Sequence, residues 1–149
     1  LDGLHQDPGE GELVRLTPAI NRIFSAPTVE EILERLDAEP QGPYENWAKE
    51  TAKTLRQKSP TSLKIALQQM LRGKSLELDE ALKLEFRLAS HLVTMPDFKE
   101  GIDAKIAGKG RAPNWAPQTV ADVDDSRIES LFETAVDGEL ELNEPRQVF

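Results

Sequence analysis

One acidic residue interrupts the apolar face of a helix expected in the second half of the chain. The apolar positions that share this face are Leu78, Ala81, Leu88, Ala89 and Leu92. Glu85 falls near the centre of the same face. Because a buried carboxylate is costly unless it is paired or protonated, Glu85 is either half of a structural ion pair or a catalytic acid or base. We expect a structural buried pair of Glu85 with Lys64, at the edge of the apolar face of the preceding helix.

Three cations in and after the next helix are candidates for binding a phosphate-bearing ligand. Lys105 lies among apolar positions that include Phe98 and Ile102, where a lysine either covers apolar surface with its stem or presents its ammonium group to an anion. Lys109 and Arg111 follow in a glycine-containing segment, either as solvated loop residues or as further phosphate ligands. This segment follows a helix instead of opening one, so it lacks the features of a phosphate-binding loop.

The remaining polar residues form no catalytic or metal-binding pattern. His5 and His91 are far apart in the sequence and have no patterned partner, so neither supports a metal site or a nucleophile–base pair. Ser59 and Ser62 are typical of helix capping. These residues therefore predict no metal site and no nucleophile–base pair.

Hydrophobic periodicity and capping residues predict an all-α chain of about seven helices with short connections. The expected helices are a short one after Thr17-Pro18, one after Thr28, and stretches at about 44–58, 59–73, 78–94, 97–107 and 126–135. We expect residues 1–15 to be a linker or a cut end, residues 16–136 to be one helical region, and residues 137–149 to be an acidic mobile tail.

The helix expected after Ser59 has a regular apolar face, which predicts that this face points inward. Its members are Leu63, Ala66, Leu67, Met70 and Leu71. Ile65 lies on the other side of this helix, and Phe86 and Val93 lie off the main face of the next one. We expect these three side chains to form an apolar patch, through which the chain self-associates or binds a missing partner.

The composition excludes several classes of partner and site. The 149 residues carry a formal net charge of −9, so no nucleic-acid partner is expected, because phosphate backbones require clustered basic residues. The chain has no cysteine, which excludes disulfides and thiolate chemistry. No apolar run is long enough to span a membrane, and no membrane partner is expected. The chain begins without methionine, and we interpret it as a fragment or a processed piece.

Four short motifs follow one another in a distinctive order: Ser59-Pro60-Thr61-Ser62-Leu63-Lys64, Glu85-Phe86-Arg87-Leu88-Ala89, Asp97-Phe98-Lys99-Glu100-Gly101 and Ala112-Pro113-Asn114-Trp115. Together they resemble the C-terminal region of the 3-hydroxyisobutyryl-CoA hydrolase family, within the crotonase (enoyl-CoA hydratase) superfamily. The resemblance runs from about Leu16 to about Thr134 and so covers most of the chain. The first and last motifs, with the extra helix around Ile128, match the hydrolases better than ordinary enoyl-CoA hydratases.

The resemblance implies a helical region that packs over an upstream core, helps to close the acyl-CoA pocket and often mediates trimer contacts. The oxyanion hole and the catalytic glutamate and aspartate of the family belong to that core and match no segment here, so this chain alone is expected to be inactive. Relatives often have a phenylalanine at the position of Lys105 and basic residues just beyond it, which Lys109 and Arg111 match best. The resemblance thus makes Lys105, Lys109 and Arg111 the candidate coenzyme A contacts.

The function implied for the complete protein is hydrolysis of 3-hydroxyisobutyryl-CoA in valine catabolism, with the coenzyme A thioester as substrate and no cofactor. The expected partners are the upstream core, the acyl-CoA substrate and, in a homo-oligomer, further copies of the protein. The expected location is the mitochondrial matrix in a eukaryote or the cytoplasm in a bacterium. Two alternatives stay open, namely a non-catalytic structural relative such as a mitochondrial ribosomal subunit, and an enoyl-CoA hydratase or isomerase.

Overall fold

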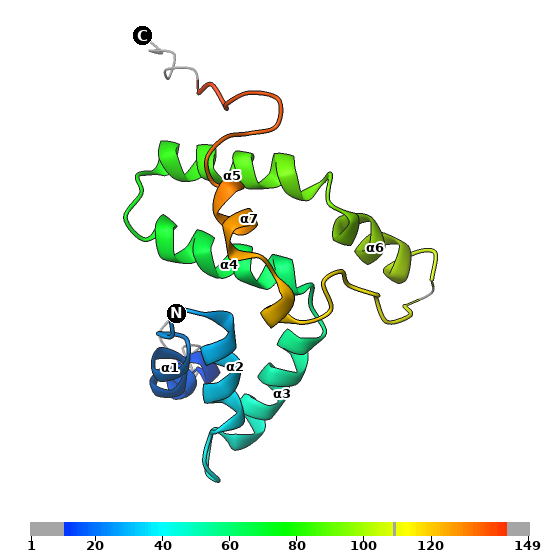
Figure 1. Ribbon diagram of the computed structural model, residues 1–149. Helices are drawn as coiled ribbons and strands as arrows, with labels where there is room; N and C mark the ends of the chain where they lie inside the picture. Colours follow the sequence, from blue (N-terminus) through cyan, green and yellow to red (C-terminus); the bar gives the residue numbers. More distant parts are fainter. Residues whose placement is uncertain (1–10, 109, 143–149) are drawn as a thin grey trace, which may run out of the picture. The chain divides into compact units, whose positions relative to one another are not determined.

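The computed structural model describes residues 11–108 and 110–142. Within these residues the chain has seven α-helices, a short 3-10 helix and no β-strand (Figure 1), which confirms the all-α prediction. The chain forms two compact units, Leu1–Leu55 and Arg56–Phe149. This boundary divides the region 16–136, which the sequence predicts as one.

The first unit consists of helices around a small apolar core. The helices are α1 (Glu12–Ile23), α2 (Val29–Asp37) and α3 (Glu45–Arg56), the last of which ends one residue past the unit boundary. The buried apolar side chains are Ala19, Ile23, Ala26, Val29, Ile32, Leu36, Ala48 and Ala52. The hydroxyl of Thr28 accepts the N–H of Glu31 at 3.2 Å and caps α2, as the sequence predicts.

Helix α1 begins earlier than the sequence predicts. Thr17-Pro18 is typical of a helix start, yet the helix begins at Glu12 and Pro18 lies inside it. Because proline has no N–H, Pro18 cannot donate the helical hydrogen bond that the Val14 carbonyl would otherwise accept from the residue four positions later. The Thr17 hydroxyl donates to the Leu13 carbonyl at 2.8 Å. Residues 12–15 therefore belong to a helix and not to the predicted linker.

The second unit contains the remaining helices. They are α4 (Pro60–Gly73), α5 (Leu78–Leu92), α6 (Pro96–Lys105), the 3-10 helix η2 (Val120–Asp122) and α7 (Asp125–Ser130). Ser59 caps α4 by accepting the N–H of Ser62 at 3.2 Å, which confirms its predicted role. Helix α7 is capped by the Asp124 carboxylate, which accepts the N–H of Ser126 at 2.9 Å.

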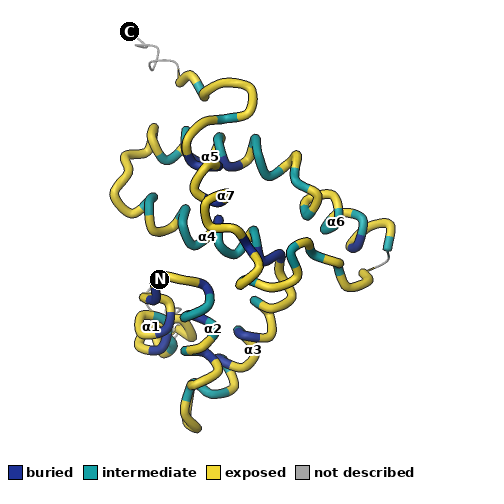
Figure 2. Tube along the Cα trace, viewed as in Figure 1, coloured by how far each residue is buried: buried dark blue, intermediate teal, exposed yellow. Residues whose placement is uncertain are grey.

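The core of the second unit lies between α7 and one face of the α4–α5 pair (Figure 1). Its buried members are Ile65, Leu84, Leu88, Val123, Ile128, Leu131 and Phe132. In Figure 2, α5 is buried where α7 passes it. Ile65 is 2% exposed, so the prediction that it belongs to an outer apolar patch is wrong. The predicted exposure of Phe86 and Val93 is confirmed.

Other apolar side chains of α4 and α5 are exposed instead of buried. We call this set the uncovered face, and it consists of Met70, Leu78, Leu82, Phe86 and Val93. Met70, which the sequence predicts to point inward, is 74% exposed. Periodicity locates apolar stripes but does not say what covers them. Both helices thus carry more apolar surface than the core in this unit uses.

The last described residues are attached to α5. Glu139 accepts a hydrogen bond from Arg87 Nε at 2.7 Å and another from the N–H of Ala135 at 3.2 Å. These contacts anchor the start of the segment that the sequence predicts as a mobile tail. Residues 143–149 of that segment lie outside the described residues.

Two leucines of α5 test which of its faces is buried. Leu88 is 2% exposed and Leu78 is 73% exposed. We expect Leu88→Ala to lower the free energy of unfolding by about 2–5 kcal/mol, because it leaves a cavity in the core. The same change at Leu78 should cost less than about 0.5 kcal/mol. Urea unfolding followed by circular dichroism measures both, and equal losses would contradict the assignment of the buried face.

Candidate functional site

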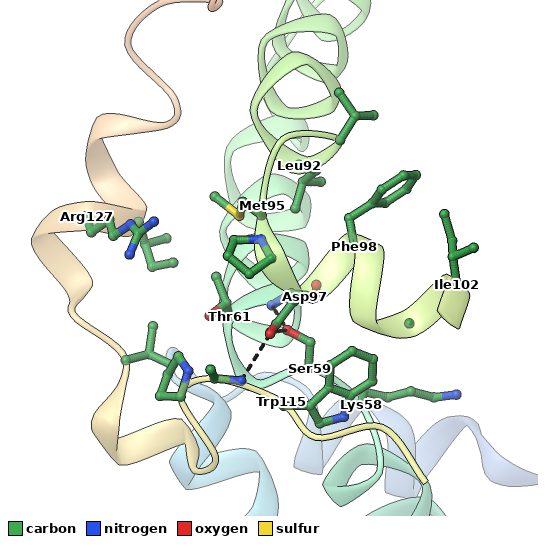
Figure 3. A pocket seen from close by; sticks show the side chains of 18 of the residues that line it. Lys58, Ser59, Thr61, Leu92, Met95, Asp97, Phe98, Ile102, Trp115 and Arg127 are labelled. Atoms are coloured by element: carbon green, nitrogen blue, oxygen red, sulfur yellow. Dashed lines mark hydrogen bonds between the residues drawn. The ribbon is translucent and has the colours of Figure 1, made fainter. Parts of the chain in front are cut away.

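A groove of about 850 Å³ opens in the second unit (Figure 3). It lies between the end of α5, α6, the start of α4 and residues 111–117, which we call the strap. Its apolar lining includes Leu92, Met95, Phe98, Ile102, Trp115 and Val123. Lys58, Lys105 and Arg127 are the cations among the lining residues. A groove of this size and lining suits an amphipathic ligand with a negatively charged group.

Three carboxylates also line the groove, and each accepts hydrogen bonds from neighbouring protein groups. Asp122 accepts the hydroxyl of Thr119 at 2.5 Å, and Asp124 caps α7. Hydrogen bonds from Ser126 lower the pKa of Asp124 below its usual value. Asp122 and Asp124 are therefore hydrogen-bonded to residues close to them in the sequence. The third carboxylate, Asp97, connects separate elements of the groove.

The Asp97 carboxylate joins three of the elements that line the groove. Its Oδ2 accepts the hydroxyl of Ser59 at 2.5 Å, and its Oδ1 accepts the N–H of Ala116 at 3.0 Å (Figure 3). Ser59 is buried and caps α4, Ala116 belongs to the strap, and Asp97 lies in the first turn of α6. One carboxylate thus ties the start of α4 and the strap to α6.

Glu100 holds the other end of the strap, one turn further along α6. Its carboxylate is paired with the Arg111 guanidinium at 2.6 and 3.0 Å and accepts the N–H of Asn114 at 2.5 Å. The hydrogen bonds from Arg111 and Asn114 lower the pKa of Glu100 from its usual 4.5 to about 2. The same pairing raises the pKa of Arg111. Two parallel N–H···O bonds fix the orientation of the guanidinium as well as its distance.

Trp115 is the apolar part of this junction. Its indole N–H donates to the Gln57 carbonyl at 3.0 Å, and its ring lies against Gly101 of α6. A Cβ atom at position 101 would stand 3.3 Å from the ring, so a side chain there would push the strap away from the helix. Glycine weakens a helix, and here it makes room for the tryptophan.

We call these contacts of Asp97, Glu100 and Gly101 with Ser59 and the strap the clasp. The clasp brings together three of the four motifs that the sequence analysis identifies. Sequence reasoning found the motifs but assigned no role to Asp97 or Glu100. One usable signal was their spacing, because residues three apart on a helix lie on the same face and can bind one neighbouring segment.

The structure does not show Glu85 in the predicted buried pair with Lys64. Glu85 is exposed, and its carboxylate lies 3.4 Å from the side-chain nitrogen of Gln69, which donates to it. Lys64 Nζ lies 2.7 Å from Asp125 Oδ1, and its side chain is only 11% exposed. The physical reason is that α7, rather than α5, supplies the carboxylate next to Lys64.

The three predicted coenzyme A contacts have different surroundings. Lys105 lines the groove and is exposed, so it is placed to meet a ligand there. Arg111 is held by Glu100 and also donates to the Ala112 carbonyl at 3.0 Å, which gives it a role in the clasp. Lys109 lies outside the described residues. Phosphate binding by any of the three stays a prediction.

His91 is not among the residues that line the groove. Its Nε2 lies 2.7 Å from the Thr134 carbonyl, and His5 lies outside the described residues. Across residues 11–108 and 110–142, no three His, Cys, Asp or Glu side chains gather as metal ligands. None of the helices in these ranges has the length and apolar character that a membrane crossing requires.

The clasp should make stability depend on pH through Glu100. A carboxylate with a lowered pKa stabilises the fold above its usual pKa of 4.5, and this contribution is lost as the pH falls toward 2. We expect Glu100→Gln to be less stable than the parent chain at pH 7, and the difference to narrow as the pH falls from about 5 to 2. Urea midpoints across this range measure it.

The matched control is Glu133→Gln, which changes an exposed glutamate outside the clasp. It should leave the urea midpoint unchanged at every pH. A difference between Glu100→Gln and the parent chain that does not vary with pH would contradict the role assigned to the Glu100 charge.

Comparison with known proteins places this arrangement in a family. A family model described as enoyl-CoA hydratase/isomerase matches residues 2–132. The mitochondrial 3-hydroxyisobutyryl-CoA hydrolase of Dictyostelium discoideum is 39% identical over 116 residues, which are 76% of this chain and 29% of the relative. Small ribosomal subunit protein mS47 of Arabidopsis thaliana is 34% identical over 131 residues, 86% of this chain and 32% of the relative.

The fold is also similar to that of a solved structure. An enoyl-CoA hydratase from Rhodobacter sphaeroides 2.4.1 superposes with a TM-score of 0.79 at 35% identity, over 93% of this chain and 40% of that one. The chain spans about a third of the length of the curated relatives that it matches, and it corresponds to their C-terminal part. The chain therefore belongs to the enoyl-CoA hydratase/isomerase family.

Proposed function

We propose that this chain is the C-terminal helical region of a 3-hydroxyisobutyryl-CoA hydrolase, which packs over an upstream catalytic core and helps to close its acyl-CoA pocket. The observation that carries the proposal is the match to hydrolases of this name over most of the chain. The reaction is hydrolysis of a coenzyme A thioester to 3-hydroxyisobutyrate and coenzyme A, a step of valine catabolism. The location is the mitochondrion in a eukaryote and the cytoplasm in a bacterium.

The uncovered face supports packing against an upstream core. Leu78 is 73% exposed, Val93 is 56% exposed and Met70 is 74% exposed. Exposed apolar side chains gain free energy when another surface removes them from water. The relatives have about two thirds of their length outside the matched region, and this upstream part is the occupant that we propose for the face.

The groove supports a role in binding the substrate. Its walls are apolar where α6 faces the strap, and Lys105 lies among the lining residues. An acyl-CoA has an acyl and pantetheine arm with apolar surface, and it has negatively charged phosphates. The arm suits the apolar wall of the groove, and the phosphates suit a lysine. The clasp engages Arg111 with Glu100, which leaves Lys105 as the better candidate for the phosphates.

Two other functions have specific observations in their favour. The mS47 match favours a structural use of the same helices in a ribosome, although a net charge of −9 makes direct contact with RNA by this chain unfavourable. The match to the solved enoyl-CoA hydratase favours hydration or isomerisation of an acyl-CoA. The hydrolase is preferred because several curated matches from different organisms carry that name.

An assay of the complete gene product tests the function directly. We expect it to release coenzyme A from 3-hydroxyisobutyryl-CoA faster than it hydrates crotonyl-CoA, and we expect the 149-residue chain alone to do neither. A thiol reagent follows release, and the loss of the enoyl absorbance follows hydration. Hydration without thiol release would indicate the hydratase, and inactivity of the complete protein with both substrates would contradict the proposal.

The uncovered face should make the isolated chain self-associate. We expect the mean mass in sedimentation equilibrium to rise with concentration, because the exposed apolar side chains can leave water by packing against a second copy. Replacing Leu82 and Phe86 together by glutamine should weaken this association. Lys99→Gln, at an exposed position on α6, is the control and should leave it unchanged. A mass that equals one chain at every concentration would contradict the prediction.

A further inference from the structure

We propose that Asp97 is a positioning residue for the acyl-CoA, because its carboxylate sets the separation of the groove walls. This inference rests on the proposed function, and it deepens that function by assigning a residue outside the upstream core to substrate binding. Asp97 lies where the start of α4, the strap and α6 meet.

The two oxygens of Asp97 hold two different walls. The bond from Ser59 Oγ fixes the start of α4, and the bond from the Ala116 N–H fixes the strap. A carboxylate accepts strong hydrogen bonds at both oxygens. A carboxamide offers one acceptor and one donor, so it keeps the shape of the side chain but cannot accept both bonds.

The walls that Asp97 joins carry the side chains that a ligand would touch. Phe98 is the next residue on α6, and Ile102 lies one turn further along the groove. Trp115, on the strap, precedes the Ala116 N–H that Asp97 holds, and its ring rests on α6 at Gly101. A shift of the strap therefore moves the tryptophan wall relative to the α6 wall. A groove that is already formed binds a ligand with less loss of conformational freedom.

The position of Asp97 in the first turn of a helix does not by itself explain its bonds to Ser59 and to the strap. Asp79 is the second residue of α5, as Asp97 is of α6, so both have the same favourable interaction with a helix N-terminus. Within the described parts of the chain, Asp79 is exposed and accepts none of the bonds seen at Asp97. Asp79→Asn therefore removes the same charge from the same helix position and leaves the clasp intact.

The first test measures KM and kcat of the complete gene product for 3-hydroxyisobutyryl-CoA. Asp97→Asn should raise KM by about tenfold, the size expected when one charge-assisted hydrogen bond is weakened. It should leave kcat within about twofold, because in the proposed function the reacting groups belong to the upstream core. Asp79→Asn should change neither. An unchanged KM in Asp97→Asn, or a fall in kcat alone, would overturn the proposal.

The second test does not depend on activity. Trp115 is one of two tryptophans, and Trp47→Phe leaves it as the only tryptophan, which excitation at the red edge of the absorption band selects over the single tyrosine. In that background Asp97→Asn should increase acrylamide quenching of Trp115 at least about twofold, because the strap is released, and Asp79→Asn should not. If Asp97→Asn fails to fold, Glu100→Gln loosens the same strap from its other end and should show the same increase.

The outcomes separate the two proposals. An inactive complete protein would contradict the proposed function and, with it, the substrate named for Asp97, whatever the quenching shows. An active protein in which Asp97→Asn leaves KM unchanged would overturn the role of Asp97 while the hydrolase assignment stands.

Discussion

The α4–α5 pair has apolar side chains on more than one side, and α7 covers one of them. This constraint determines how the second unit is built. Leu84 and Leu88 of α5, with Ile65 of α4, face α7 and form the core, whereas Met70 and Phe86 are left exposed. Helices gain stability mainly by burying an apolar face, and the exposed apolar side chains of these two helices are the observation on which the proposal of an upstream covering surface rests.

The groove follows from the same layout. Helix α6 follows the end of α5 at Met95-Pro96, and its apolar residues Phe98 and Ile102 are exposed and form a wall of the groove. Hydrogen bonds, and not a buried apolar core, hold the strap opposite this wall. Asp97 and Glu100 accept these bonds from the strap. The result is an apolar groove with a polar frame, an arrangement suited to a ligand with both characters.

Several local features were predictable from the sequence, whereas the contacts between distant residues were not. The helix caps at Thr28 and Ser59 depend on residues three apart, and both were predicted. The buried side of α4 was predicted wrongly, because α7 buries Ile65 although the more regular stripe contains Met70. The clasp joins Asp97 to residues 38 and 19 positions away, so no local pattern reveals it.

The most direct test of the uncovered face compares the chain's two methionines. Met70 lies on the uncovered face, whereas Met95 packs against the core of the second unit. Methionine oxidation by dilute peroxide follows exposure, and mass spectrometry gives the rate at each site. The account predicts that Met70 oxidises faster than Met95 in the 149-residue chain and slows at least about tenfold in the complete gene product. An equal Met70 rate in both would contradict the claim that an upstream region covers this face.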